Sequence, residues 1–273
     1  MKKLNKYYTI LIFAFLYLPM VVLMVASFNK GKDITDFEGF TLNRYVELFQ
    51  DNTLLPLLGN SLKLALMSSA IATVMGTAAA IGIFRLRPGM RKLVLQVTNI
   101  PMTNPDIVTG VSLSLLFVFM GQLLRKNNML GFGTMLITHI TFNLPYVVLN
   151  VLPKIRQMDP ALNEAALDLG CTPLQAFFKV TIHEIMPGIV SGAIMAFTMS
   201  LDDFVISYFV YGPNFVTLPV EIYNYTKKPL QPKIYALFTL LFGMILVLMT
   251  VMNVLQARSE KRKTMQRSRK EVV

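Results

Sequence analysis

The sequence predicts an all-α integral membrane protein with six transmembrane helices. Of its 273 residues, 54% are hydrophobic and only 15% are charged, and the mean hydropathy is +0.53. Soluble domains contain about 45–50% apolar residues and about 25% charged residues. Six apolar stretches are also long enough to cross a hydrocarbon core of about 30 Å. These observations favour a membrane protein over a soluble globular domain.

The six candidate spans can be placed to within a few residues. They are Tyr7–Phe28, Leu57–Phe84, Leu93–Met120, Phe132–Leu152, Gly188–Tyr211 and Ile234–Leu255. The first follows three lysines and ends near Ala26 and Ser27, so a cleaved signal peptide is the alternative interpretation. A signal core typically has about 7–15 apolar residues, and this run is longer. We therefore interpret it as a span.

The basic residues predict how the chain crosses the membrane. Lys and Arg outnumber Asp and Glu by 26 to 15. If the N-terminus is cytoplasmic, most of these basic residues lie in segments on the cytoplasmic side. Cytoplasmic loops are enriched in Lys and Arg, so both termini are expected in the cytoplasm. The basic tail 257–273 could contact nucleic acid. Positive charge just inside a last span, however, usually sets the orientation of the protein in the membrane and contacts lipid headgroups. We expect membrane lipid and no nucleic acid as a partner.

Small residues in the second span predict close helix packing. Ser68, Ala72, Gly76 and Ala80 recur at every fourth position. Small side chains on one face let two helix backbones approach each other, so this face is expected to pack against a helix of this subunit or of a sister subunit.

The segment between the fourth and fifth spans is polar, and its first half predicts a short helix. Asp159-Pro160 is a typical helix start, since proline is favoured at the first helical position. Four apolar side chains follow at helical spacing, and Gly170 is expected to end the helix in a left-handed conformation. These four are Leu162, Ala165, Ala166 and Leu169.

A second helix is predicted to begin almost at once. Thr172-Pro173-Leu174-Gln175 has the spacing of a capping box, and Pro187-Gly188 predicts the bend into the fifth span. The apolar stripe of the first helix has little neighbouring chain to cover it, so docking into a groove of a partner protein is favoured. Lying on the membrane surface is the alternative, but the acidic polar face disfavours anionic lipid.

The spacing in this loop resembles a known family signature. The pattern is Glu164-Ala165-Ala166, three residues, Gly170, nine residues and then Val180-Thr181-Ile182. It resembles the cytoplasmic loop of permease subunits of type I ABC importers. The resemblance implies a coupling helix that sits in a cleft of an ATPase subunit. It implies coupling roles for Glu164, Ala165, Ala166, Asp168 and Gly170. His183 departs from the pattern, which usually has proline there, whereas Pro187 matches a second proline of many members.

No catalytic or metal site is expected in the chain. His183-Glu184 could begin an HExxH zinc motif, but its second histidine position is Pro187. His139, in the fourth span, is expected to form hydrogen bonds between helices. The chain lacks a phosphate-binding loop, because Gly31-Lys32 is followed by Asp33. ATP hydrolysis would then belong to a partner, and the competing hypothesis is a proton-coupled secondary carrier.

Carboxylates inside the predicted spans are the candidate residues that line the substrate pathway. Asp106 lies in the third span, and Asp202 and Asp203 lie in the fifth. Charged groups inside spans are costly and so indicate function, although hydrogen bonding to neighbouring helices is the alternative. In a continuous helix Asp203 would share a face with Ser200 and Ser207 while Asp202 faced elsewhere, because successive positions differ by about 100°. We predict Asp203 nearer the pathway and Asp202 in a supporting or gating role.

Carboxylates suit a cationic substrate, and aromatic side chains nearby support that inference. Tyr208 belongs to a group that can attract ammonium ions through its ring faces, although aromatic belts at membrane interfaces give the same enrichment. The group comprises Tyr208, Phe209, Tyr211, Tyr223 and Tyr225.

A second resemblance concerns the substrate. Three stretches are similar to the second permease subunit of spermidine/putrescine ABC importers. They are SLDDFVISYFVYGP, LPVEIY and PMTNPDIVTGVSLSLLF. This implies a complex with an ABC ATPase dimer, a homologous permease subunit and an extracytoplasmic polyamine-binding protein, in the cytoplasmic membrane. It divides the chain into a first helix and outer loop (1–56), a permease core (57–256) with the coupling loop 153–187, and the basic tail (257–273). Import of another small solute is the alternative.

Overall fold

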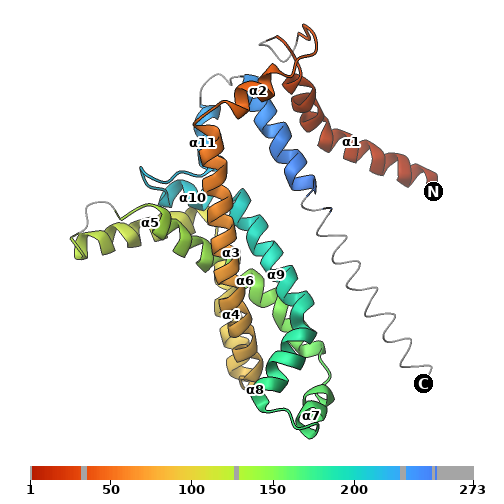
Figure 1. The fold of residues 1–273 in the computed structure, drawn as a ribbon, viewed down its shortest axis with the longest axis vertical. Helices are drawn as coiled ribbons and strands as arrows, with labels where there is room; N and C mark the ends of the chain where they lie inside the picture. Colours follow the sequence, from red (N-terminus) through yellow and green to blue (C-terminus); the bar gives the residue numbers. More distant parts are fainter. Residues whose placement is uncertain (1, 32–35, 126–128, 228–231, 248–249, 251–273) are drawn as a thin grey trace. The chain divides into compact units, whose positions relative to one another are not determined.

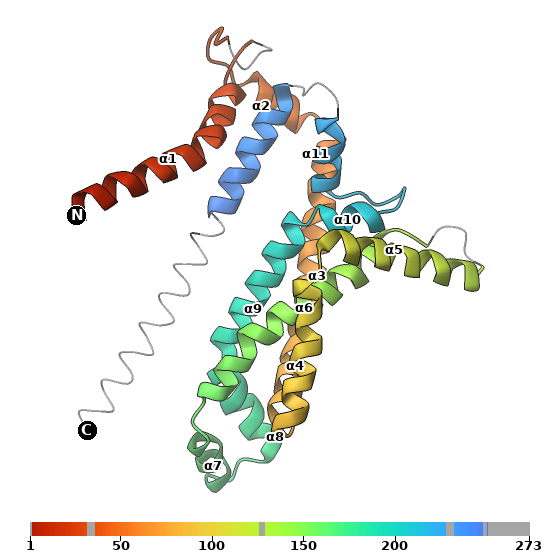
Figure 2. The ribbon, with the colours of Figure 1, turned by 180° about the vertical axis from the view of Figure 1, so that it is seen from behind.

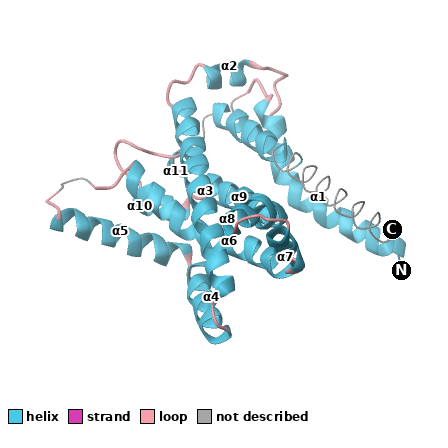
Figure 3. Ribbon diagram, turned by 60° about the horizontal axis from the view of Figure 1, so that its bottom comes forward, coloured by secondary structure: helices cyan, strands magenta, loops and turns pink. Residues whose placement is uncertain are grey.

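The computed structural model describes residues 2–31, 36–125, 129–227, 232–247 and 250, and within them the secondary structure is helical, without strands (Figure 3). Contacts divide the chain into two units. One unit combines Met1–Pro56 with Asn224–Val273, and the other is Leu57–Tyr223. The basic tail and the end of the predicted sixth span lie outside the described residues.

The first unit contains helices α1 (Lys2–Ser27) and α2 (Asn43–Phe49) and the helix Pro232–Val247. The Lys233 ammonium lies 2.7 Å from a carboxylate oxygen of Asp51 in the loop after α2. Burial alone would raise the pKa of Asp51, but hydrogen bonds from Lys233, Thr53 and Leu54 outweigh burial and hold that pKa below its ordinary value. The carboxylate is therefore charged at neutral pH and ties the loop after α2 to the start of the last apolar helix.

The second unit carries the long helices that bear the candidate site. Helix α3 (Leu54–Arg85) leads into α4 (Pro88–Thr103), α5 (Asp106–Leu123) and α6 (Phe132–Gln157). Short helices α7 (Ala161–Asp168) and α8 (Pro173–Ala176) and a π-helix (Phe177–Thr181) then lead to α9 (Ile182–Asp202). Helices α10 (Val205–Val210) and α11 (Leu218–Thr226) follow. Figures 1 and 2 show α6 beside α9, α5 beside α10, and α7 at the end of the α6–α9 pair.

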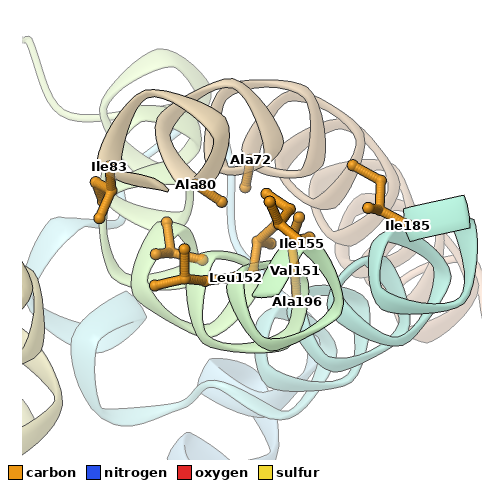
Figure 4. Packing of buried hydrophobic residues seen from close by; sticks show 10 residues of the cluster. Ala72, Ala80, Ile83, Val151, Leu152, Ile155, Ile185 and Ala196 are labelled. Carbon is orange, nitrogen blue, oxygen red and sulfur yellow. The ribbon is translucent and has the colours of Figure 1, made fainter. Parts of the chain in front are cut away.

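The core of this unit forms where α3, α6 and α9 meet (Figure 4). Ala72 and Ala80 of α3 face branched side chains of α6, including Val147 and Val151, and all four are fully buried. An added Cβ at Gly76 would lie 2.7 Å from the Val147 Cβ, so the α3 backbone touches α6 here. The expected close packing through small residues of α3 is confirmed.

This close approach gives a test of the packing. Gly76→Ala should destabilise the protein by about 1–3 kcal/mol, because overpacking forces side chains or backbone to shift. Gly82→Ala is the matched control, since nothing lies within 4 Å of its added Cβ on the same helix. Thermal unfolding of the detergent-purified protein should show a lower midpoint for Gly76→Ala than for Gly82→Ala. Equal midpoints would mean that α3 and α6 do not pack at Gly76.

Within the described part of the chain, five helical segments are long and apolar enough to cross a membrane. They are Tyr7–Ser27, Leu54–Arg85, Asp106–Leu123, Phe132–Gln157 and Pro173–Asp202. The predicted sixth span, Ile234–Leu255, begins with the shorter apolar helix Pro232–Val247, and most of its remainder lies outside the described residues.

The prediction of one unbroken third span was wrong. Helix α4 ends at Thr103, and Asn104 and Pro105 are extended, with ψ angles of 138° and 134°. A residue before proline is disfavoured in the helical region, and proline also lacks the amide hydrogen that would continue the helix. Asp106 therefore begins α5 instead of lying in mid-span.

The predicted fifth span, Gly188–Tyr211, was wrong at both ends. Helix α9 already begins at Ile182, so Pro187-Gly188 lies inside the helix and does not mark its start. At the other end α9 stops at Asp202, Asp203 is extended with ψ 116°, and α10 begins at Val205. At this break the Asp203 carboxylate accepts hydrogen bonds from the backbone amides of Ile206 and Ser207. Such side-chain bonds compete with the backbone hydrogen bonds of a continuous helix.

Candidate functional site

An open pocket of about 260 Å³ lies where α9 gives way to α10. Its walls combine acidic with aromatic side chains: Asp106, Asp202, Asp203, Phe142, Tyr146 and Phe204. The three carboxylates singled out in the sequence thus line one site, although they come from segments about 100 residues apart.

Two helix breaks create this convergence. Asp106 is the first residue of α5, after the extended Asn104-Pro105, and Asp202 is the last residue of α9. Asp203 leaves the helix immediately. The expectation that helical geometry turns Asp202 and Asp203 to different faces was therefore wrong, because the chain is no longer helical at Asp203.

Asp203 is the more buried of the two neighbouring carboxylates. Its side chain is 9% exposed. Its Oδ2 accepts hydrogen bonds from the Ser207 amide at 2.8 Å and the Ser207 hydroxyl at 2.6 Å, and its Oδ1 accepts one from the Ile206 amide at 3.3 Å. The carboxylate thus satisfies the free amides at the start of α10, whereas Asp202 is exposed.

An aromatic cluster adjoins the pocket. The Phe204 ring, which lines the pocket, lies 4.4 Å from the Tyr223 ring and 5.7 Å from the Tyr208 ring, between centroids. Tyr208 also packs against Phe209 and Tyr211. The predicted clustering is confirmed for these residues, and it brings ring faces next to the carboxylates.

His139 is bonded between helices, as predicted. It is fully buried on α6, and its Nδ1 lies 2.5 Å from the Ser200 hydroxyl of α9. Its Nε2 lies 3.0 Å from the Ser207 hydroxyl of α10. The sequence placed Ser200 and Ser207 on one face, but it did not indicate that both hydroxyls bond the same imidazole, because His139 lies on a helix about 60 residues earlier. Across the described residues, no group of three or more His, Cys, Asp or Glu side chains could hold a metal ion.

The loop between α6 and α9 has the local structure that the sequence predicts. The Asp159 carboxylate accepts a hydrogen bond from the Ala161 amide at 3.0 Å as α7 begins. Gly170 ends it with φ +83°, and the amides of Gly170 and Cys171 donate to the carbonyls of Leu167 and Ala166. This pair of bonds is a Schellman motif. The capping box of Thr172 and Gln175 is also present.

Helix α7 exposes most of its surface. Glu164, Ala165 and Asp168 are exposed, whereas Ala166 is buried. Leu169 is 86% exposed and Leu174, just after the turn, is 71% exposed. Apolar side chains this open, at the tip of a helix pair, are typical of a protein-binding surface. We call this the α7 surface, comprising Glu164, Ala165, Asp168, Leu169 and Leu174.

The sequence matches a family model described as "Binding-protein-dependent transport system inner membrane component" over residues 72–265. The chain belongs to this family. It is a membrane permease subunit of an ABC transporter and not an enzyme.

Relatives of the permease are similar over most of their length. It is 38% identical to the putrescine transport system permease protein PotI of Escherichia coli (strain K12), over 92% of this chain and 90% of that protein. It is 36% identical to the spermidine/putrescine transport system permease protein PotC of the same strain, over 91% and 92%.

Solved structures share the fold of the permease. A chain of a bacterial ABC transporter involved in the import of alginate, an acidic polysaccharide, superposes with a TM-score of 0.73 at 19% identity, covering 92% of both chains. A chain of the MetNI methionine ABC transporter, in an inward-facing conformation, gives 0.60 at 18% identity, covering 75% of the permease and 95% of that chain. The permease therefore has the type I ABC importer permease fold that the signature loop predicts.

Proposed function

We propose that this permease forms half of a membrane pathway for polyamines, spermidine or putrescine, in an importer driven by ATP hydrolysis on a partner subunit. The observation that carries the proposal is the convergence of Asp106, Asp202 and Asp203 in one pocket beside aromatic rings. The names of the relatives support the same substrate class.

The chemistry of the pocket fits a flexible organic cation. Removing a carboxylate from water is costly unless a cation accompanies it, and a protonated amine supplies that charge during passage. Aromatic faces such as that of Phe204 attract ammonium groups by about 0.5–2 kcal/mol. Separate acidic groups along one wall suit a molecule with two or more ammonium groups joined by methylenes. An anionic substrate would instead meet repulsion here.

The α7 surface supports the choice of energy source. We propose that it docks in a cleft of the ATPase dimer, with Glu164, Ala165, Ala166, Asp168 and Gly170 as the coupling residues. A proton-coupled carrier would leave this exposed apolar helix tip without a purpose. The remaining partners are a homologous permease subunit, which completes the pathway, and an extracytoplasmic polyamine-binding protein.

The proposal also fixes the topology. The α7 surface must face the ATPase, so we place it and both termini in the cytoplasm, in a cytoplasmic membrane. The division into a first helix with its outer loop (1–56), a permease core (57–256) and a cytoplasmic tail (257–273) remains a part of this proposal.

Competitive uptake tests the substrate class. Cells lacking their own polyamine import, supplied with this chain and its partner subunits, should accumulate labelled putrescine. Excess unlabelled spermidine should suppress that uptake, whereas 1,4-butanediol, which has the same carbon chain without charge, should not. No accumulation of labelled putrescine by the assembled complex would assign the importer to another solute.

A further inference from the structure

A chain of side-chain hydrogen bonds runs through the second unit and ends on Asp203. The Ser68 hydroxyl of α3 lies 2.7 Å from the Ser200 hydroxyl, which lies 2.5 Å from Nδ1 of His139. Nε2 of His139 lies 3.0 Å from the Ser207 hydroxyl, which lies 2.6 Å from Oδ2 of Asp203. Ser68, His139 and Ser207 are fully buried. This hydrogen-bond chain thus joins α3, α6, α9 and α10 at the helix break between α9 and α10.

The number of available hydrogens gives this chain a direction. The Ser207 hydroxyl donates its one hydrogen to the Asp203 carboxylate, so it must accept from His139, and Nε2 must carry a hydrogen. The Nδ1 atom of a neutral imidazole is then an acceptor, and Ser200 donates to it. Ser200 in turn accepts from Ser68. The hydroxyls of Ser200 and Ser207 then each donate once and accept once, and the Ser68 hydroxyl directs its hydrogen to Ser200 at 2.7 Å in preference to the Ala65 carbonyl at 3.3 Å.

We propose that His139 is a positioning residue for the substrate pocket, acting as the neutral Nε2–H tautomer. Through Ser207 it orients the Asp203 carboxylate, and it does not touch the substrate itself. The inference rests on the proposed function in treating the pocket that contains Asp203 as part of the cation pathway.

The same geometry identifies the carboxylate oxygen that meets a cation. Oδ2 of Asp203 already accepts the Ser207 amide and hydroxyl, and Nε2 of His139 stands 3.6 Å from it. Among the described residues, Oδ1 accepts a single, longer hydrogen bond from Ile206 at 3.3 Å. A carboxylate oxygen has two lone pairs, so Oδ1 retains acceptor capacity that Oδ2 has used. The hydrogen-bond chain thus leaves Oδ1 for an ammonium group.

Substitutions at His139 separate positioning from packing. His139→Leu removes the donor to Ser207, and in a complex that assembles we expect the KM for putrescine uptake to rise about tenfold, because the Ser207 hydroxyl is then no longer held toward the Asp203 carboxylate. His139→Gln, whose amide can still donate to Ser207, should restore most of the affinity. Thr141→Val is the matched control, because that exposed α6 hydroxyl bonds within its own helix, to the Ile137 carbonyl. An unchanged KM in His139→Leu would overturn the proposal.

The tautomer can be observed directly by ¹⁵N NMR of the assembled, histidine-labelled complex. The permease contains two histidines, His139 and His183, so subtracting the spectrum of the His139→Gln complex isolates the signals of His139. We expect a protonated Nε2 and an unprotonated Nδ1. The opposite tautomer or a cationic ring would overturn the proposal, whichever solute is transported.

A second variant covers the case in which His139→Leu does not assemble. Ser207→Ala removes the hydroxyl between His139 and Asp203, and the same rise in KM is expected, whereas an unchanged KM would overturn the proposal. Absence of polyamine uptake by the wild-type complex would contradict the proposed function and leave the NMR result to decide the role of His139.

Discussion

Gly170→Pro is expected to abolish ATP-driven uptake while leaving the permease inserted in the membrane. Gly170 has φ +83°, whereas proline is confined to φ near −65°. Proline would also remove the Gly170 amide that donates to the Leu167 carbonyl at 2.9 Å. The strain and the lost cap amount to about 2 kcal/mol or more, enough to move Leu169 away from its docked position and weaken ATPase binding more than tenfold.

The control for this variant keeps the backbone conformation. Gly170→Asn should retain uptake, because asparagine tolerates the left-handed region better than other non-glycine residues. Copurification of the ATPase with the permease measures docking separately from transport. If ATPase copurification and uptake in Gly170→Pro match those of the wild type, the α7 surface is not the ATPase contact.

Charge reversal on the same helix tests the docking face. Glu164→Arg should also detach or uncouple the ATPase, because Glu164 is exposed on α7 and a reversed charge there opposes complementary docking. Glu164→Gln, similar in size, should have a smaller effect. Equal, wild-type ATPase binding in both variants would exclude an electrostatic role for Glu164.

Asp203→Asn is expected to reduce polyamine uptake at least about tenfold, because truncating or neutralising one partner of a buried charge pair costs about 2–5 kcal/mol. Asparagine also turns one acceptor oxygen into a donor, which conflicts with the amide of Ile206 or with the donors of Ser207, depending on which way the amide points. Asp202→Asn should have a smaller effect, since Asp202 is exposed and forms the rim of the pocket. Initial rates of labelled spermidine uptake at several concentrations measure both effects.

An acidic residue in the other unit serves as the control for these variants. Glu47→Gln removes a carboxylate whose side chain is 52% exposed and which pairs with Arg44 at 3.6 Å, so its contribution to uptake should be small. If Glu47→Gln and Asp203→Asn reduce uptake equally, the effect reflects overall charge and not the pocket.

Local sequence signals predicted the coupling loop well. The bounds of α7, the left-handed Gly170 and the capping box of Thr172 and Gln175 each depend on a few neighbouring residues, and the structure shows all of them. The small-residue series of α3 was likewise sufficient to predict close helix packing, but it did not identify α6 as the partner that Gly76 contacts. These features are set by backbone conformation and side-chain size within one or two helical turns.

The sequence identified the acidic residues that line the pocket but not how they are arranged. Hydropathy identified costly carboxylates at Asp106, Asp202 and Asp203, yet a continuous-helix interpretation separated the last two. Apolar residues flank both helix breaks, so a hydropathy window as long as a span averages over the few polar residues at each break. Pro105 explains the first break, whereas at the second the Asp203 carboxylate accepts the amides of Ile206 and Ser207, and Ser207 is bonded in turn to His139 of α6.

Transport by the purified complex tests the central claim most directly. The permease, its partner permease, the ATPase dimer and the binding protein would be reconstituted in proteoliposomes, with ATP on the side of the α7 surface. We predict ATP-dependent accumulation of labelled putrescine or spermidine, lost in Asp203→Asn and unaffected by excess 1,4-butanediol. A complex that hydrolyses ATP in response to its binding protein but accumulates neither polyamine would contradict the account.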